Sequence, residues 1–254
     1  MDRRPVEATG STEAARATGA TMRQGAVGAV RLVERDGRRL VEKRLPDAER
    51  HRAEVSALQA LSLVDDLPTP QLIEDRADAV LMSEMPGTRL DEVDRETRLQ
   101  GLRASASLLR RLHDLAPPSG LRPRPDDEAI IARYRAADAP PLPLDIPPAS
   151  GRAFCHGDWG DGNLLAVDGA ISAIVDWEAA HVGDPLRELS RAAWGASRKD
   201  PRSSAALIDA YGADADDVHR WDAIHAAELW LWFAEAGPPE YLAQLTAELR
   251  EWGA

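Results

Sequence analysis

Residues 155–176, CHGDWGDGNLLAVDGAISAIVD, determine the interpretation of the whole chain. Two short apolar runs flank Asp168-Gly169, a pair of residue types that is typical of a tight turn between antiparallel strands. The sequence therefore predicts a β-hairpin that starts after Asn163 and returns at Asp176. Because the two ends of a hairpin lie side by side, we expect the Asn163 amide and the Asp176 carboxylate to converge.

These residue types suit a divalent cation and a proton acceptor. Asn and Asp oxygens are hard ligands of the kind that hold Mg²⁺ against nucleotide phosphates. Asp158 precedes Asn163 by five residues, so it would lie near such an ion without binding it. It would then be free to accept a proton from a substrate hydroxyl. An aspartate, an asparagine five residues later and a further aspartate form the phosphoryl-transfer arrangement of kinases.

Two other interpretations of this stretch stay open. In the first, His156 caps a turn and the acidic side chains are solvated, which would suit any one of these residues but not their joint pattern on a hairpin. In the second, Cys155, His156 and Asp158 are the metal ligands of a hydrolase. The spacing permits such a site, but no second cluster of histidine and aspartate completes it.

The N-terminal part independently favours nucleotide binding. Residues 22–45 alternate like two strands joined by a turn at residues 35–38, and Gly25 and Gly28 could lay backbone N–H groups over phosphates. The chain contains 29 arginines but only two lysines, and Lys43 falls inside the second expected strand. A lysine there indicates a need for a compact positive charge.

Glu54 is the natural partner of Lys43. It lies in residues 47–62, which read as a helix opened by Asp47, with Leu58 and Leu61 on the same stripe. A carboxylate on an apolar stripe requires a partner. The plain alternative is a surface lysine and a solvated glutamate.

At this point the segments CHGDWGDGNLL and IVDWEAAHVGDPLREL closely resemble the aminoglycoside phosphotransferase family, which are small-molecule kinases with a protein-kinase-like fold. The resemblance extends from about Met22 to the C-terminal helices. It implies an α+β, two-lobed fold with ATP, or alternatively GTP, and Mg²⁺ in the cleft. We expect a small β-sheet lobe with one helix over residues 1–85 and a larger, mainly helical lobe over residues 86–254.

The resemblance also implies roles for individual residues. Asp158 would be the catalytic base and His156 the structural residue of the catalytic loop, with Asn163 and Asp176 as the Mg²⁺ ligands and Lys43 and Glu54 as the ion pair of the nucleotide lobe. Asp184 matches an aspartate that braces the catalytic loop. Residues 112–115, LHDL, also resemble a segment of the family, and we assign them a packing role.

The family resemblance places the purine-binding hinge in the MSEM segment. Met82 would lie near the gatekeeper position, and the Ser83 carbonyl and the Met85 amide would pair with the purine edge. The sequence departs from the protein-kinase pattern after Asp176, because only residues 177–184 run from there through Asp184. That leaves no room for the activation segment of a protein kinase and counts against a protein substrate.

The charge distribution bears on the acceptor. The chain has a net charge of −12, which makes nucleic acid an unsuitable partner, and residues 86–254 carry −10 of it. Such a field would favour a cationic acceptor. Glu178 could face an amine, and Glu228, next to the aromatic residues of 230–233, could belong to an acidic, aromatic wall. Alternatively, the tryptophans are core and the acids ordinary surface.

We therefore expect an enzyme that phosphorylates a hydroxyl of an aminoglycoside or another antibiotic. The motifs equally allow a metabolic kinase for a sugar, an amino alcohol or a choline-like acceptor, and the atypical glycine loop allows a nucleotide-binding pseudokinase. A single cysteine, Cys155, and the lack of a secretory signal or a membrane span favour a cytoplasmic protein. We expect a monomer or weak dimer. The proline-rich residues 116–150 should be mostly loop, with one short helix near Ile130.

Overall fold

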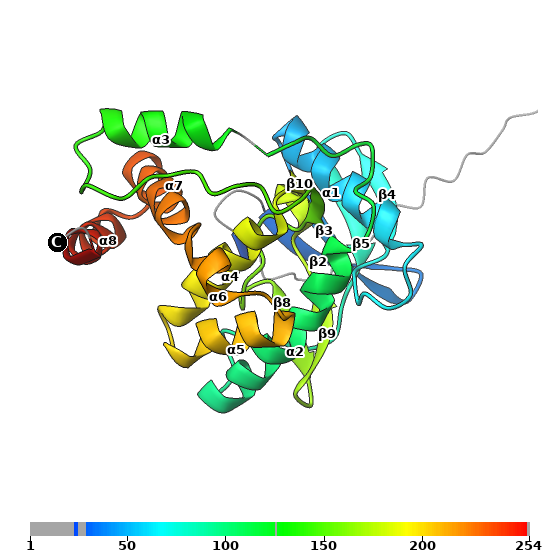
Figure 1. Cartoon of the computed structure of the whole chain (residues 1–254). Coiled ribbons are helices and arrows are strands. Elements are labelled where there is room, and N and C mark those ends of the chain that lie inside the picture. Colours follow the sequence, from blue (N-terminus) through cyan, green and yellow to red (C-terminus); the bar gives the residue numbers. More distant parts are fainter. Residues whose placement is uncertain (1–22, 25–28, 125, 253–254) are drawn as a thin grey trace, which may run out of the picture.

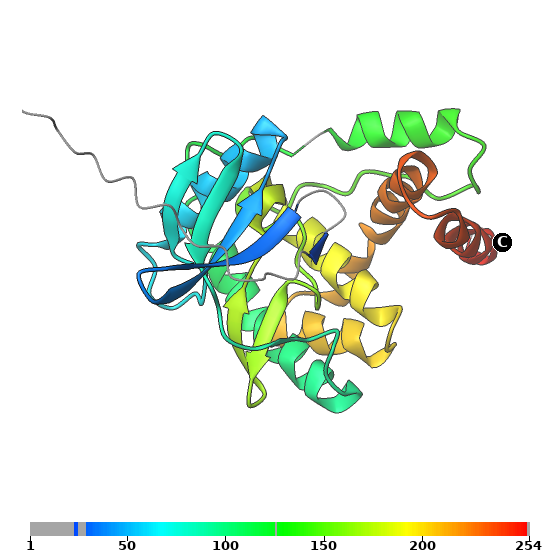
Figure 2. The same ribbon diagram turned by 180° about the vertical axis from the view of Figure 1, so that it is seen from behind.

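The computed structural model describes residues 23–24, 29–124 and 126–252, and its first part is an antiparallel sheet (Figures 1 and 2). The strand order is β1-β2-β3-β5-β4. The strands are β1 (Arg23–Gln24), β2 (Ala29–Arg35), β3 (Arg38–Arg44), β4 (Leu72–Arg76) and β5 (Ala79–Ser83). Asp36 and Gly37, between β2 and β3, both have positive φ, 53° and 71°. This is the geometry of a two-residue hairpin turn whose twist matches the strands, so the predicted turn is confirmed.

The helix α1 (Ala48–Leu61) packs against β4 and β5. The Asp47 side chain accepts hydrogen bonds from the backbone N–H groups of Glu49 and Arg50, at 2.8 and 3.0 Å. It therefore begins the helix as predicted. Leu58 and Leu61 are buried, and so is Glu54 on the same stripe.

The hairpin predicted between Asn163 and Asp176 is also present, and we call it the catalytic hairpin after its predicted role. It consists of β8 (Leu164–Val167) and β9 (Ala170–Ile174), and the short β6 (Thr88–Arg89) pairs with β8 to give a three-stranded sheet. The turn residues Asp168 and Gly169 have φ of 51° and 80°. A second antiparallel pair consists of β7 (Ala153–Cys155) and β10 (His181–Gly183). The short helix η1 (Trp177–Ala179) precedes β10 in the chain. The two pairs hold the loop that carries His156 and Asp158 between them.

Most of the remaining described chain is helical. These helices are α2 (Arg95–His113), α4 (Pro185–Ser197), α5 (Arg202–Tyr211), α6 (Ala215–His219), α7 (Asp222–Glu235) and α8 (Pro239–Trp252). One apolar core runs from α1 and β5 through α2 to α4 and α5. The order of elements is thus a sheet with one helix and then a mainly helical region, which is the α+β organisation that the sequence predicts.

The proline-rich insert contains the one short helix expected there, α3 (Asp127–Ala136). Ile130 and Ile131 pack with Trp230 and Leu231 of α7 in a second apolar cluster, which also includes α8. Figure 1 shows α3, α7 and α8 together at the end of the molecule opposite β4. Within the described part of the chain, no helix combines the length and apolarity needed to cross a bilayer.

Candidate active site

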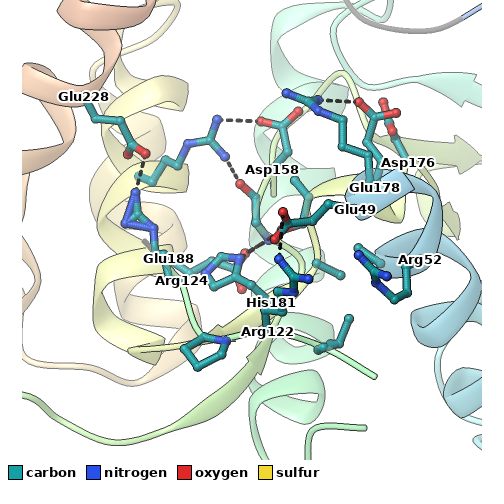
Figure 3. Close-up of a pocket in the computed structure, with 18 of the residues that line it drawn as sticks. Glu49, Arg52, Arg122, Arg124, Asp158, Asp176, Glu178, His181, Glu188 and Glu228 are labelled. Atoms are coloured by element: carbon teal, nitrogen blue, oxygen red, sulfur yellow. Dashed lines mark hydrogen bonds and ion pairs between the residues drawn. The ribbon is translucent and has the colours of Figure 1, made fainter. Parts of the chain in front are cut away.

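A pocket of about 650 Å³ opens between the sheet with α1 on one side and α4 and α7 on the other (Figure 3). Lys43 of β3, Asp158 of the loop after β7 and Asp176 at the end of the catalytic hairpin all line it. Residues that are far apart in the sequence therefore share one cavity, as the motif pattern predicts.

Lys43 is surrounded by carboxylates. Its Nζ lies 2.6 Å from Glu54 Oε2, 2.5 Å from Asp176 Oδ1 and 2.9 Å from Glu178 Oε2. Burial alone would lower the pKa of Lys43, but the three negative charges raise it above its ordinary value. The ammonium is therefore charged. The structure brings Lys43 and Glu54 together in the expected ion pair.

The two ends of the hairpin meet at Asn163. The Val175 N–H donates to the Asn163 backbone carbonyl at 3.0 Å, so Asp176 follows immediately beside it. The Asn163 Nδ2 donates to the Asp158 carbonyl and to Asp158 Oδ2, both at 2.9 Å. The Asn163 Oδ1 takes part in neither of these two bonds, and an amide oxygen together with the Asp176 carboxylate would suit a hard divalent cation such as Mg²⁺.

His156 holds the loop in place. Its Nδ1 accepts the Asp158 N–H at 3.2 Å, and its Nε2 lies 3.0 Å from the Val175 carbonyl. The ring is buried and packs on Trp177 with centroids 4.5 Å apart. Burial lowers the pKa of His156, which favours the neutral ring with a proton on Nε2. Both ring nitrogens are occupied, so the structure contradicts the hydrolase alternative in which His156 binds a metal.

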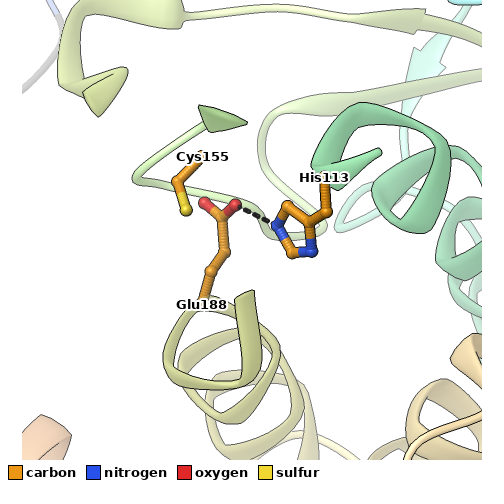
Figure 4. A group of neighbouring side chains, drawn as sticks. All are labelled: His113, Cys155 and Glu188. Carbon is orange, nitrogen blue, oxygen red and sulfur yellow. Dashed lines mark hydrogen bonds and ion pairs between the residues drawn. The ribbon is translucent and has the colours of Figure 1, made fainter. Parts of the chain in front are cut away.

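Glu188 of α4 is a structural determinant that the sequence analysis missed. Its carboxylate accepts the His156 N–H at 3.1 Å, the Gly157 N–H at 2.5 Å and a bond from His113 Nε2 at 2.8 Å (Figure 4). Burial alone would raise the pKa of Glu188, but His113 and the other histidines lower it to about 2. Gly157 has φ of +85°, and a Cβ there would lie 2.0 Å from the Ala179 carbonyl oxygen. Only glycine fits that position.

Asp184 does something other than predicted. Its side chain accepts the N–H groups of Leu186 and Arg187 and so begins α4, and it also accepts the Ser150 N–H at 2.6 Å. It therefore anchors the segment before β7, and Glu188 is the residue that braces the catalytic loop. His113, to which we assigned only packing, also bonds the Tyr211 hydroxyl at 2.8 Å.

His113, Cys155 and Glu188 could hold a metal by their proximity, because one ligand atom from each lies within 4.8 Å of the others. Their chemistry argues against it. Burial raises the pKa of the Cys155 thiol, which therefore stays protonated. The Glu188 oxygens are already bonded to the loop and to His113. The cluster is a structural hydrogen-bond network.

Arg191 of α4 is a second residue that the sequence analysis missed. Its guanidinium donates to the Gly157 carbonyl and lies 2.8 Å from Asp158 Oδ1. Burial alone would raise the pKa of Asp158, but Arg191, His156 and Asn163 lower it below its ordinary value. Asp158 is therefore ionised. Nothing in the local sequence around Arg191 indicates this contact, because it depends on how α4 packs.

The two carboxylates expected to meet the acceptor, Glu178 and Glu228, do line the pocket. Each, however, is paired with cations of the chain itself. Glu178 lies 2.9 Å from Lys43 and 2.8 Å from Arg50. Glu228 bonds Arg124 and lies 3.4 Å from Arg187. Both carboxylates are thus paired within the chain in this conformation, and their contact with an acceptor stays a prediction.

The residues expected to hold the nucleotide base have ordinary structural contacts. Met82 is buried in β5, the Ser83 N–H donates to the Gln71 carbonyl at 2.9 Å, and the Ser83 hydroxyl lies 3.8 Å from Met85 Sδ. The hinge assignment stays a prediction. Gly25 and Gly28 lie outside the described residues.

The sheet with one helix and the mainly helical region after it form a fold of the kinase-like class. Residues 21–224 match the phosphotransferase enzyme family APH, so the chain belongs to that family. No protein with a curated description matches the chain.

Solved structures share the fold at low identity. The macrolide 2'-phosphotransferase MphH from Brachybacterium faecium is 18% identical, with 91% of each chain covered and a TM-score of 0.66. A thermostable mutant of aminoglycoside phosphotransferase APH(4)-Ia is 16% identical over 93% of this chain and 95% of that one, with a TM-score of 0.67. ADP-bound APH(2'')-Ib is 11% identical over 93% of each, with a TM-score of 0.65.

Proposed function

We propose that the protein transfers the γ-phosphate of ATP, with Mg²⁺, to a hydroxyl of a small molecule, and that the acceptor is an aminoglycoside or another antibiotic. One observation carries this proposal: Lys43, Asp158 and Asp176 line one pocket, with Lys43 paired to Asp176 and Asn163 bonded to Asp158. Two similar proteins support the nucleotide and the acceptor class, since their structures hold ADP, or AMP-PNP with hygromycin B.

The residues divide the work of phosphoryl transfer. Asp158 would accept the proton of the acceptor hydroxyl, and Arg191 and Asn163 hold its carboxylate in position. Lys43 would stabilise negative charge on the phosphates. Asn163 Oδ1 and the Asp176 carboxylate would hold Mg²⁺, which neutralises phosphate charge during transfer. Together they align the hydroxyl and the phosphate.

The test is ADP release over a panel of hydroxylated antibiotics and metabolites. Asp158→Ala should retain Mg–ATP binding and lose about 10²–10⁴ in turnover, since that is the usual contribution of a general base. Asp209→Ala, an exposed aspartate on α5, serves as the control. Unchanged turnover in Asp158→Ala would remove this residue from the mechanism.

The same panel separates the alternatives. Turnover on a sugar, an amino alcohol or a choline-like compound with none on antibiotics would make the protein a metabolic kinase. Mg–ATP binding with no ADP from any acceptor would favour a pseudokinase, although the complete set of Asp158, Asn163 and Asp176 argues against it. Cys155 is a free, buried thiol, which is compatible with the cytoplasmic location that we predict.

A further inference from the structure

The charge of the pocket differs from that of the surrounding chain. Acidic side chains are in large excess in residues 86–254, but the pocket is lined by seven acidic side chains and by seven lysines or arginines. Most of the net negative charge of the second half therefore lies outside the pocket lining. A cation entering the pocket meets no net negative charge.

We call Arg124, Arg187, Glu228, Leu229 and Trp232 the distal wall, because they line the pocket from α4, from α7 and from the segment before α3 rather than from the sheet. Figure 3 shows two of them, Arg124 and Glu228, apart from Asp176 and Glu178. Glu228 is the only carboxylate of the distal wall. Glu228 pairs with Arg124 and Arg187, and both arginines also pair with Asp127, so these four side chains form a charge-balanced network. A substrate amine would have to compete with the two arginines for Glu228. The distal wall is therefore poorly suited to a polycation.

The other two residues of the distal wall, Leu229 and Trp232, are apolar. Trp232 is 42% exposed although its neighbours on α7 pack inward, and Leu229 lies one helical turn before it. The Trp232 ring packs on Phe233 with centroids 5.0 Å apart, and Phe233 packs on Tyr241 of α8 at 5.8 Å. This support holds Trp232 in place at the pocket. A fixed indole beside an aliphatic side chain binds the apolar face of a ring.

From the charge balance, the paired Glu228 and the supported Trp232, we propose that the acceptor presents an apolar face to the distal wall and carries at most one positive charge. This inference rests on the proposed function and narrows it. It favours hydroxyl compounds built on a large apolar ring over polycationic aminoglycosides. It also reverses the expectation of a cationic acceptor that net charge alone suggests.

The first experiment compares erythromycin, a hydroxylated macrocycle with one amine, with the polycation gentamicin and with uncharged hydroxylated compounds. Binding is measured by calorimetry with and without Mg²⁺ and ADP, and turnover by ADP release. We expect the tightest compound to carry no more than one positive charge and to bind almost independently of salt, because screening acts on charge pairs. Tighter binding of gentamicin, or no binding by any uncharged or singly charged compound, overturns the inference.

The second experiment tests the distal wall with Trp232→Ala. It should raise the KM of the best acceptor about tenfold, the loss expected for one aromatic contact, while the KM for ATP stays unchanged. Trp252→Ala is the matched control, since Trp252 is 47% exposed on α8 and lies outside the pocket lining. Equal effects of the two substitutions would overturn the role of Trp232.

Failure of this inference is distinguishable from failure of the proposed function. ADP release with gentamicin as the preferred acceptor would refute the inference and leave phosphotransfer intact. Binding of an apolar acceptor without ADP release from any compound would refute phosphotransfer, and the binding measurements would still support the acceptor class.

Discussion

The Lys43 ammonium lies 2.5 Å from the Asp176 carboxylate, although the two residues are 133 positions apart. This contact links the five-stranded sheet to the catalytic hairpin. Lys43 also bonds Glu54 and contacts Glu178, so its three N–H donors face three carboxylates. A phosphate can accept from Lys43 only after Asp176 or Glu178 moves away. If Asp176 bound Mg²⁺, its carboxylate would no longer need to pair with Lys43.

Lys43→Met should abolish tight Mg–ATP binding and destabilise the fold by about 3 kcal/mol, because it leaves Glu54 buried without its partner. The free energy of unfolding in urea and the nucleotide affinity are the measurements. The chain provides its own control in Lys199→Met, because Lys199 is half exposed and lies outside the pocket lining. Equal stability and equal affinity in the two variants would contradict the role of Lys43.

Asn163→Ala should raise the Mg²⁺ concentration that ADP binding requires by about tenfold or more, which is the usual cost of altering a metal site. It removes the Oδ1 donor and also frees the Asp158 side chain. Calorimetric titration of ADP at several Mg²⁺ concentrations measures the effect. Asp158→Ala, which removes no proposed ligand, should leave the Mg²⁺ titration near that of the unaltered chain. An unshifted titration in Asn163→Ala would rule out the ligand assignment.

Glu188→Gln should loosen the catalytic loop. The substitution removes the charge that accepts the His156 and Gly157 N–H groups, and hydrogen bonds to a charged group contribute about 1.5–3 kcal/mol. We expect lower turnover with little change in the KM for ATP. We also expect faster reaction of Cys155, a buried free thiol beside Glu188, with a thiol reagent. Glu251→Gln, on the exposed surface of α8, is the control; a Cys155 no more reactive than in that control would argue against a bracing role.

Local signals in the sequence predicted what local geometry determines. The turn residues Asp168-Gly169 specify the hairpin, and the hairpin in turn brings Asn163 next to Asp176. Contacts made by helix packing had no such signal. Arg191 and Glu188 reach the loop only because α4 packs against β7. Net charge does not indicate which carboxylates of the pocket are already paired, as Glu178 and Glu228 are, so the cationic acceptor expected from it stays a prediction.

Some expectations are not decided by the structure. The division into residues 1–85 and 86–254 stays a prediction, as do the hinge contacts of Ser83 and Met85 and the roles of Gly25 and Gly28.

His225 of α7 should make the stability of the protein depend on pH. Burial lowers the pKa of His225 to about 4, whereas a histidine of the unfolded chain titrates near 6.5. Below pH about 6.5, His225 binds a proton in the unfolded chain but stays neutral in the folded chain. The free energy of unfolding therefore falls as the pH falls towards 4. The difference between the two pKa values corresponds to about 3 kcal/mol.

Urea unfolding of the unaltered chain and of His225→Gln, measured at several pH values between 7 and 4, isolates this contribution. Because His156 and His181 also have pKa values lowered by burial, the unaltered chain and the variant should both lose stability in this range. The loss should be smaller in His225→Gln, since glutamine takes up no proton in either state. His219→Gln is the control, as His219 is half exposed and lies outside the pocket lining. Parallel curves for the unaltered chain and His225→Gln would show that His225 titrates normally in the folded protein.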